Sequence, residues 1–167
     1  ADQATILPIV VVTALGDETL VIQVLRLGAC DYVAKEGSYL ERLPSVLQTA
    51  VTEFRKPETD DRRIGKRTRH ILYVEQNAAD IDLTIRYFAE AAPQFRLEVA
   101  RSSRQAFSLL QKRPFDLVLV DLRMPDMNGL DFLVEAKHAS IKTPFIITTG
   151  RGDESAAVAA LKLGAYD

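Results

Sequence analysis

Apolar residues follow two alternating patterns along the chain: short continuous runs, and longer segments in which they recur at helical spacing. The continuous runs have the length of buried strands, and the helical spacing indicates amphipathic helices. In the second half of the chain, strands are predicted at Ile71–Glu75, Phe95–Ala100, Phe115–Val120 and Pro144–Thr149. Helices are predicted over Ala79–Ala92, from Ser102 through Leu110, after the Asn128-Gly129 turn to about His138, and from Asp153 to Gly164.

The first third of the chain shows the same alternation. Strands are predicted at Ile9–Thr13 and Tyr32–Ala34, and helices from Asp17 to Gly28 and from around Pro44 to about Arg55. Pro44 suits the first turn of a helix, and Ser38 with Glu41 resembles a capping box for a turn that precedes it. Residues 57–69 are polar and lack periodicity, which is typical of a linker.

One segment occurs twice. Leu7–Asp31 aligns without a gap with Thr143–Asp167, and 10 of the 25 aligned pairs are identical. Unrelated segments of this length would share about one or two. The same module is therefore expected twice, with neither copy whole, so that the chain is a piece of a longer tandem protein.

The alternation of strands and helices predicts the fold class. Strands that are apolar throughout and separated by helices indicate a parallel sheet covered on both faces. Sites in such folds form at the C-terminal ends of the strands. Polar residues stand at these ends: Glu75, Asp121, Thr149, Thr13 and Lys35.

The chain resembles response-regulator receiver domains in four stretches: ILYVEQN, FDLVLVDLRMPDMNG, PFIITTGRGDE and GACDYVAK. The resemblance implies a flavodoxin-like α/β fold, a doubly wound parallel sheet of five strands in the order 2-1-3-4-5. It also implies that an aspartate accepts a phosphoryl group from a histidine kinase or phosphotransfer protein, with Mg²⁺ as the cofactor. In these terms, residues 1–56 are the C-terminal half of a first module, from strand 4 to helix 5. Residues 70–167 are a second module that lacks strand 5 and helix 5.

The resemblance assigns the phosphoacceptor and the metal site. Asp121 follows an apolar strand and precedes the MPDMNG turn, and its carboxylate is a suitable nucleophile toward phosphohistidine. The metal ligands implied are Glu75, Gln76, Asp121 and the backbone carbonyl of Arg123. Mg²⁺ favours one or two carboxylates with phosphate and water. Gln76 departs from the family's acidic pair and removes one negative charge.

The remaining site residues come from both modules. Thr149 and the backbone amide of Gly150 are expected to bind phosphoryl oxygens, with Thr13 as the counterpart of Thr149 in the first module. Lys35 matches the family's lysine and is expected to pair with Asp121 or the phosphate, although Glu36 follows where the family has proline. Tyr32 either matches the family's aromatic switch or packs in the core.

The two partial modules are expected to complete one another. The N-terminal segment supplies a fifth strand and a last helix, so it can pack against Ile71–His138 in the same chain or in a swapped partner. Ile9–Thr13 and Pro144–Thr149 then compete for one position beside Phe115–Val120. We expect the N-terminal strand to take it, with Lys35 and Thr13 completing the Asp121 site and Thr143–Asp167 displaced.

Composition limits the possible binding partners and the cellular location, and two alternative functions stay open. The net charge of −2 gives no general attraction to nucleic acid or an anionic membrane, and no apolar run reaches membrane-spanning length. A single cysteine, Cys30, is consistent with a reducing cytoplasm, where we expect the protein to act. Any enzymatic activity would be weak autophosphorylation or autodephosphorylation. The alternatives are a pseudo-receiver that binds partners without phosphotransfer, and a flavin- or nucleotide-binding enzyme, although no phosphate-binding glycine loop follows Glu75.

Overall fold

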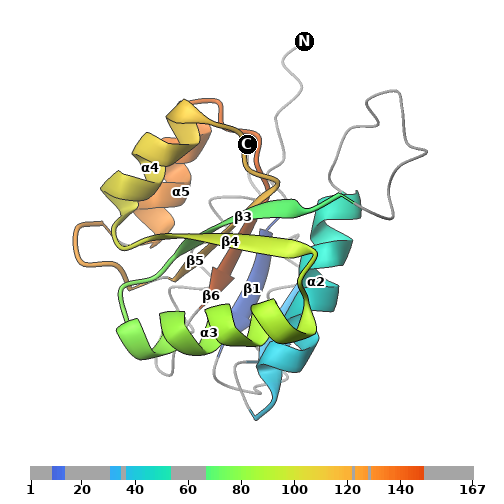
Figure 1. Cartoon of the computed structure of the whole chain (residues 1–167). Coiled ribbons are helices and arrows are strands. Elements are labelled where there is room, and N and C mark those ends of the chain that lie inside the picture. Colours follow the sequence, from blue (N-terminus) through green and yellow to red (C-terminus); the bar gives the residue numbers. More distant parts are fainter. Residues whose placement is uncertain are drawn as a thin grey trace.

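A single parallel sheet with helices on both faces forms the molecule in this computed structural model, which describes residues 9–13, 31–34, 37–53, 67–121, 123–127 and 129–148 (Figure 1). The strands are β1 (Ile9–Thr13), β2 (Asp31–Ala34), β3 (Arg69–Val74), β4 (Phe95–Ala100), β5 (Leu117–Asp121) and β6 (Phe145–Thr148). The helices are α2 (Tyr39–Glu53), α3 (Ala78–Ala91), α4 (Ser103–Lys112) and α5 (Gly129–His138). The order of strands across the sheet is β2-β1-β6-β5-β3-β4, and every neighbouring pair is parallel.

Local sequence signals account for most element boundaries. The strand predicted at Phe95–Ala100 is observed over those residues. One half of the capping box predicted at Ser102 and Gln105 is present, because the Gln105 amide donates to Ser102 Oγ at 3.1 Å. Gln105 Oε1 accepts the amide of Arg101, the residue before the cap, at 2.9 Å. The helices predicted from Asp17 and Asp153 lie outside the described residues.

The start of α2 differs from the prediction. The helix begins at Tyr39 rather than around Pro44, which lies inside it. The Glu41 amide donates to the carbonyl of Ser38 at 2.9 Å, so the turn suggested by Ser38 and Glu41 runs directly into the helix. Pro44 is the sixth residue of α2, beyond the first turn, so its missing backbone donor removes one hydrogen bond within the helix.

One face of the sheet is covered by α4 and α5. Ala106 of α4 and three residues of α5, Phe132, Leu133 and Ala136, are buried against the sheet. They contact one side of the strands through residues such as Val118 and Ile147, which is the alternation expected of a strand covered on two faces. The apolar runs in β5 and β6 are therefore buried from both sides.

The opposite face is covered by α3 and α2, although α2 comes from the N-terminal segment (Figure 1). Leu43 and Leu47 of α2 are buried in one cluster with Ile71, Leu117 and Ile146 from the three central strands. The N-terminal segment thus packs against these strands within the same chain, which is one of the two arrangements expected for it.

The prediction that Ile9–Thr13 takes the position beside β5 is wrong. β6 lies beside β5, and β1 lies beyond β6, so Pro144–Thr149 is not displaced by Ile9–Thr13. A parallel sheet can lengthen by one strand without losing backbone hydrogen bonds, because each inserted strand pairs on both sides. The parallel α/β fold of the family is confirmed, and among the described residues the sheet holds six strands because both β1 and β6 enter it.

No helix among the described residues is long and apolar enough to cross a membrane.

Candidate functional site

Three central strands end together at the C-terminal edge of the sheet, and their last residues define the candidate site. Glu75 directly follows β3, Asp121 ends β5, and Thr148 ends β6. Thr148 is the register partner of Asp121, and Val74 is the register partner of Val120. Because parallel strands all end at the same edge, the residues that follow β3 and β5 lie near one another there.

Asp121 keeps part of its surface exposed, unlike the four buried residues that precede it in β5. Its Oδ1 accepts the backbone amide of Arg123 at 2.9 Å, which turns the chain sharply after the strand. The carboxylate is thus held by the loop that follows it and remains accessible to solvent. These are the conditions that a nucleophilic carboxylate requires.

Glu75 is the most deeply buried acidic side chain at this edge, with 1% of its surface exposed. Its Oε1 accepts the amides of Gln76 at 2.8 Å and Asn77 at 2.9 Å. Asn77 in turn caps α3, because its Oδ1 accepts the amides of Ala79 and Asp80. The start of α3 therefore holds the Glu75 carboxylate in place at the end of β3.

Gln76 bridges the ends of two strands. Its Nε2 donates to the backbone carbonyl of Arg123 at 3.1 Å, across the edge from β3 to the loop after β5. Both residues are exposed. Glu75, Gln76, Asp121 and Arg123, the four positions that the resemblance assigns to the metal, are thus close together.

The oxygen atoms at this edge suit a hard cation. Glu75 and Asp121 supply two carboxylates and Arg123 a carbonyl, a set within the range of ligands that Mg²⁺ accepts. Receiver domains generally bind Mg²⁺ at the phosphorylation site. Within the described part of the chain, no group of three or more His, Cys, Asp or Glu side chains is placed to hold a metal ion, and position 76 carries an amide.

Tyr39 at the start of α2 belongs to the electrostatic surroundings of the site and was missed from the sequence. Burial raises the pKa of its phenol, and the carboxylates of Asp80, Glu75 and Asp121 raise it further. A lone tyrosine at a helix start carries no motif. Its relation to the acidic residues depends on α2 packing beside α3.

Thr148, which was not predicted as a site residue, has a buried hydroxyl that donates to the Val120 carbonyl at 3.4 Å, so this hydroxyl belongs to the sheet rather than to the open edge. The other predicted site residues are placed less completely. Thr149, Gly150 and Lys35 lie outside the described residues. Thr13 and Tyr32 are in β1 and β2, where the structure describes the backbone and not these side chains.

Backbone register places the N-terminal strands farther from Asp121 than expected. β6 separates β1 from β5, so Thr13 does not lie beside Asp121. Ala34, which precedes Lys35, is the register partner of Thr13 in β2. Three strand spacings separate β2 from β5, or about 14 Å. The insertion of β6 thus adds one strand spacing to the distance that Lys35 would have to cover.

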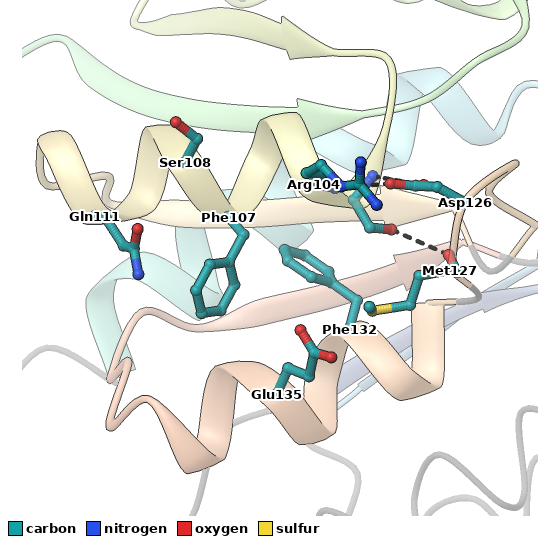
Figure 2. Close-up of a pocket in the computed structure, with 9 residues that line it drawn as sticks. Arg104, Phe107, Ser108, Gln111, Asp126, Met127, Phe132 and Glu135 are labelled. Atoms are coloured by element: carbon teal, nitrogen blue, oxygen red, sulfur yellow. Dashed lines mark hydrogen bonds between the residues drawn. The ribbon is translucent and has the colours of Figure 1, made fainter.

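The loop after Asp121 is also anchored at its far end. Asp126 accepts the amides of Ser103 at 3.0 Å and Arg104 at 2.9 Å, and Ser103 Oγ donates to the Met127 carbonyl at 3.0 Å (Figure 2). Desolvation raises the pKa of Asp126, but the hydrogen bonds from these two amides outweigh it and lower the pKa overall. The loop that carries Arg123 is therefore fastened to the first turn of α4.

A groove of about 420 Å³ lies between α4 and α5 beside this anchor. Figure 2 shows Phe107 of α4 and Phe132 of α5 pointing toward one another, with Glu135 below them and Asp126 and Met127 at one end. Neither Glu75 nor Asp121 lines this groove.

Comparison with known proteins identifies the family. The model of the response regulator receiver domain matches residues 71–167. The response regulator PilR of Pseudomonas aeruginosa is 41% identical over 68 residues, which cover 41% of this chain and 15% of PilR. The response regulator SaeR of Staphylococcus aureus is 32% identical over 98 residues, covering 59% of this chain and 42% of SaeR. The chain therefore spans less than half the length of these two relatives.

Solved structures agree with this assignment. A response regulator receiver domain protein from Clostridium thermocellum has a TM-score of 0.51 at 29% identity, covering 59% of this chain and 78% of that one. Full-length FixJ from B. japonicum has a TM-score of 0.53 at 30% identity, covering 61% of this chain and 49% of FixJ. The motif after β5, the parallel sheet and the family match together place the chain in the family of response-regulator receiver domains of two-component systems.

Proposed function

We propose that Asp121 accepts a phosphoryl group from a histidine kinase or phosphotransfer protein, and that this changes the interactions of the domain with its partners. The main support is the position of Asp121, whose accessible carboxylate ends a buried central strand beside Glu75. In the proposed step, a carboxylate oxygen forms a bond to phosphorus while the phosphorus–nitrogen bond of the phosphohistidine breaks. An acyl phosphate forms, and the histidine ring keeps the electron pair and takes up a proton.

The proposed cation site comprises Glu75, Gln76, Asp121 and the carbonyl of Arg123. A bound Mg²⁺ would supply positive charge opposite the phosphoryl oxygens as the group transfers. The chain's own contribution is to hold the ligands. Glu75 is held by the start of α3, and the Asp121 carboxylate is held by the Arg123 amide.

Five further residues are proposed on the resemblance. Thr149 and Gly150 would bind phosphoryl oxygens, Lys35 would pair with the phosphate, and Tyr32 would act as a switch residue. Thr13 would serve in place of Thr149 where the first module's fourth strand adjoins Asp121. In the observed order of strands, Thr149 is the better candidate, since it follows β6 directly beside β5.

We also propose that the chain combines parts of two modules, residues 1–56 and residues 70–167, joined by residues 57–69. The repeat of Leu7–Asp31 at Thr143–Asp167 supports this division. So does the family match, which begins at residue 71. The exchange of the N-terminal segment between two chains is the alternative to the packing within one chain.

Mass spectrometry after incubation with acetyl phosphate and Mg²⁺ tests the proposed acceptor. We expect the intact protein to gain the mass of one phosphoryl group and Asp121→Asn to gain none, with the fold of the variant retained by circular dichroism. Asp82→Asn is the matched control, because Asp82 is an exposed aspartate on α3 whose ion pair among the described residues is with Arg86 of the same helix. Labelling that persists in Asp121→Asn would refute the assignment, and a wild-type protein that is never labelled would favour a pseudo-receiver.

A further inference from the structure

The side chain of Gln76 forms a direct link where the family's pattern has an acidic residue. Its Nε2 lies 3.1 Å from the Arg123 carbonyl oxygen. The same residue, Arg123, donates its amide to Asp121 Oδ1 at 2.9 Å. One short loop is thus tied to the end of β3 through its carbonyl and to the end of β5 through its amide.

The chemistry of the two partners decides which end of the Gln76 carboxamide faces Arg123. A backbone carbonyl oxygen only accepts hydrogen bonds, whereas a glutamine side chain offers an NH₂ donor and a carbonyl acceptor. Two acceptor oxygens 3.1 Å apart would repel one another, so the NH₂ group must face Arg123. A carboxylate at position 76 would have no donor, and a cation would be needed between it and the carbonyl.

We infer that Gln76 is a positioning residue that replaces the cation in holding the Arg123 loop, and that it competes with Mg²⁺ for the Arg123 carbonyl. This inference rests on the proposed cation site of Glu75, Asp121 and the Arg123 carbonyl, and it replaces the ligand role given there to Gln76 by a competing one. The Gln76 hydrogen bond keeps the loop in place without metal. A cation that takes the Arg123 carbonyl as a ligand displaces that hydrogen bond, so Gln76 lowers the affinity of the site for Mg²⁺.

Titration of the full chain with Mg²⁺ by calorimetry, without phosphodonor, separates a competitor from a ligand. If Gln76 competes, Gln76→Ala binds Mg²⁺ about two- to tenfold more tightly than the wild type, the range expected for one hydrogen bond. Gln76→Met keeps the length of the side chain without its donor and should behave in the same way. Gln76→Asp adds a charged ligand as well and should bind most tightly. Weaker or equal binding by Gln76→Ala and Gln76→Met would overturn the inference.

Hydrogen exchange in chelator gives a second measurement that involves no metal. The amides of Arg123, Met124, Asp126 and Met127 should exchange faster in Gln76→Ala than in the wild type, because the link to β3 is gone. Gln94→Ala is the matched control: Gln94 is an exposed glutamine in the turn before β4, at the opposite edge of the sheet. It should leave both exchange and Mg²⁺ affinity unchanged. Unchanged exchange in Gln76→Ala would overturn the inference.

The two proposals fail in distinguishable ways. Phosphorylation of Asp121 with equal Mg²⁺ affinity in the wild type and Gln76→Ala would overturn the role of Gln76 alone. Absence of Mg²⁺ binding in every variant, including Gln76→Asp, would overturn the proposed cation site and the competition together.

Discussion

Leu47 tests whether α2 is part of the core of the second module. It is fully buried, with 0% of its surface exposed, in one cluster with Ile71, Leu117 and Ile146. These neighbours come from three central strands, whereas Leu47 comes from the N-terminal segment. Truncation to alanine should therefore destabilise the whole sheet rather than α2 alone.

The expected loss follows from the atoms removed. Leu47→Ala deletes three buried carbon atoms, which corresponds to about 2.4 kcal/mol of transfer free energy at about 0.8 kcal/mol for each. A cavity at the centre of the cluster adds to this, so the free energy of unfolding should fall by about 3 to 4 kcal/mol. For a chain of this size, the melting temperature should fall by roughly 6 to 16 °C.

Urea unfolding followed by circular dichroism measures the effect. Thr49→Ala is the control, because Thr49 lies two residues further along α2 and its exposed hydroxyl donates only to the Ser45 carbonyl. It should change stability by less than about 0.5 kcal/mol. A loss below about 1 kcal/mol in Leu47→Ala would refute the packing of α2. Stability that depends on protein concentration would indicate exchange between chains instead.

Three further predictions concern the sheet and its loops. Asp116→Ala should lower the free energy of unfolding in urea by about 3 kcal/mol or more, because the buried guanidinium of Arg69 then lacks the carboxylate that lies 3.6 Å away. The double variant with Arg69→Met should recover part of this loss. Asp126→Asn should lower the melting temperature at pH 7. Because the pKa of Asp126 is lowered in the folded protein, its carboxylate stabilises the fold above about pH 4 and this stabilisation is lost at lower pH. A difference in melting temperature between wild type and variant that grows in acid would contradict this. Burial raises the pKa of Tyr73, so the neutral phenol stabilises the fold up to about pH 10 and this stabilisation falls at higher pH. Tyr73→Phe should therefore unfold at a higher pH than the wild type in an alkaline titration. An unchanged pH of half-unfolding would argue against the burial of Tyr73.

Local patterns were sufficient to predict most of the elements and the position of Asp121 at the end of a strand. Strands and helices depend on the spacing of apolar residues within about ten positions, so Phe95–Ala100 and the Ser102 cap could be predicted directly. Asp121 could be predicted as well, because a polar residue after an apolar run lies at the end of a strand. The start of α2 was missed because a favourable turn at Ser38 outweighed the preference of Pro44 for the first turn of a helix.

Only the tertiary structure decided which strands are neighbours. The strands of a parallel sheet covered on both faces are apolar throughout, so β1 and β6 carry no local signal that ranks one above the other beside β5. The link from Gln76 to Arg123 spans 47 residues, and the bonds from Asp126 to α4 span 22 and 23. Such contacts depend on where the chain returns, because hydrogen bonds act over about 3 Å whatever the separation in sequence.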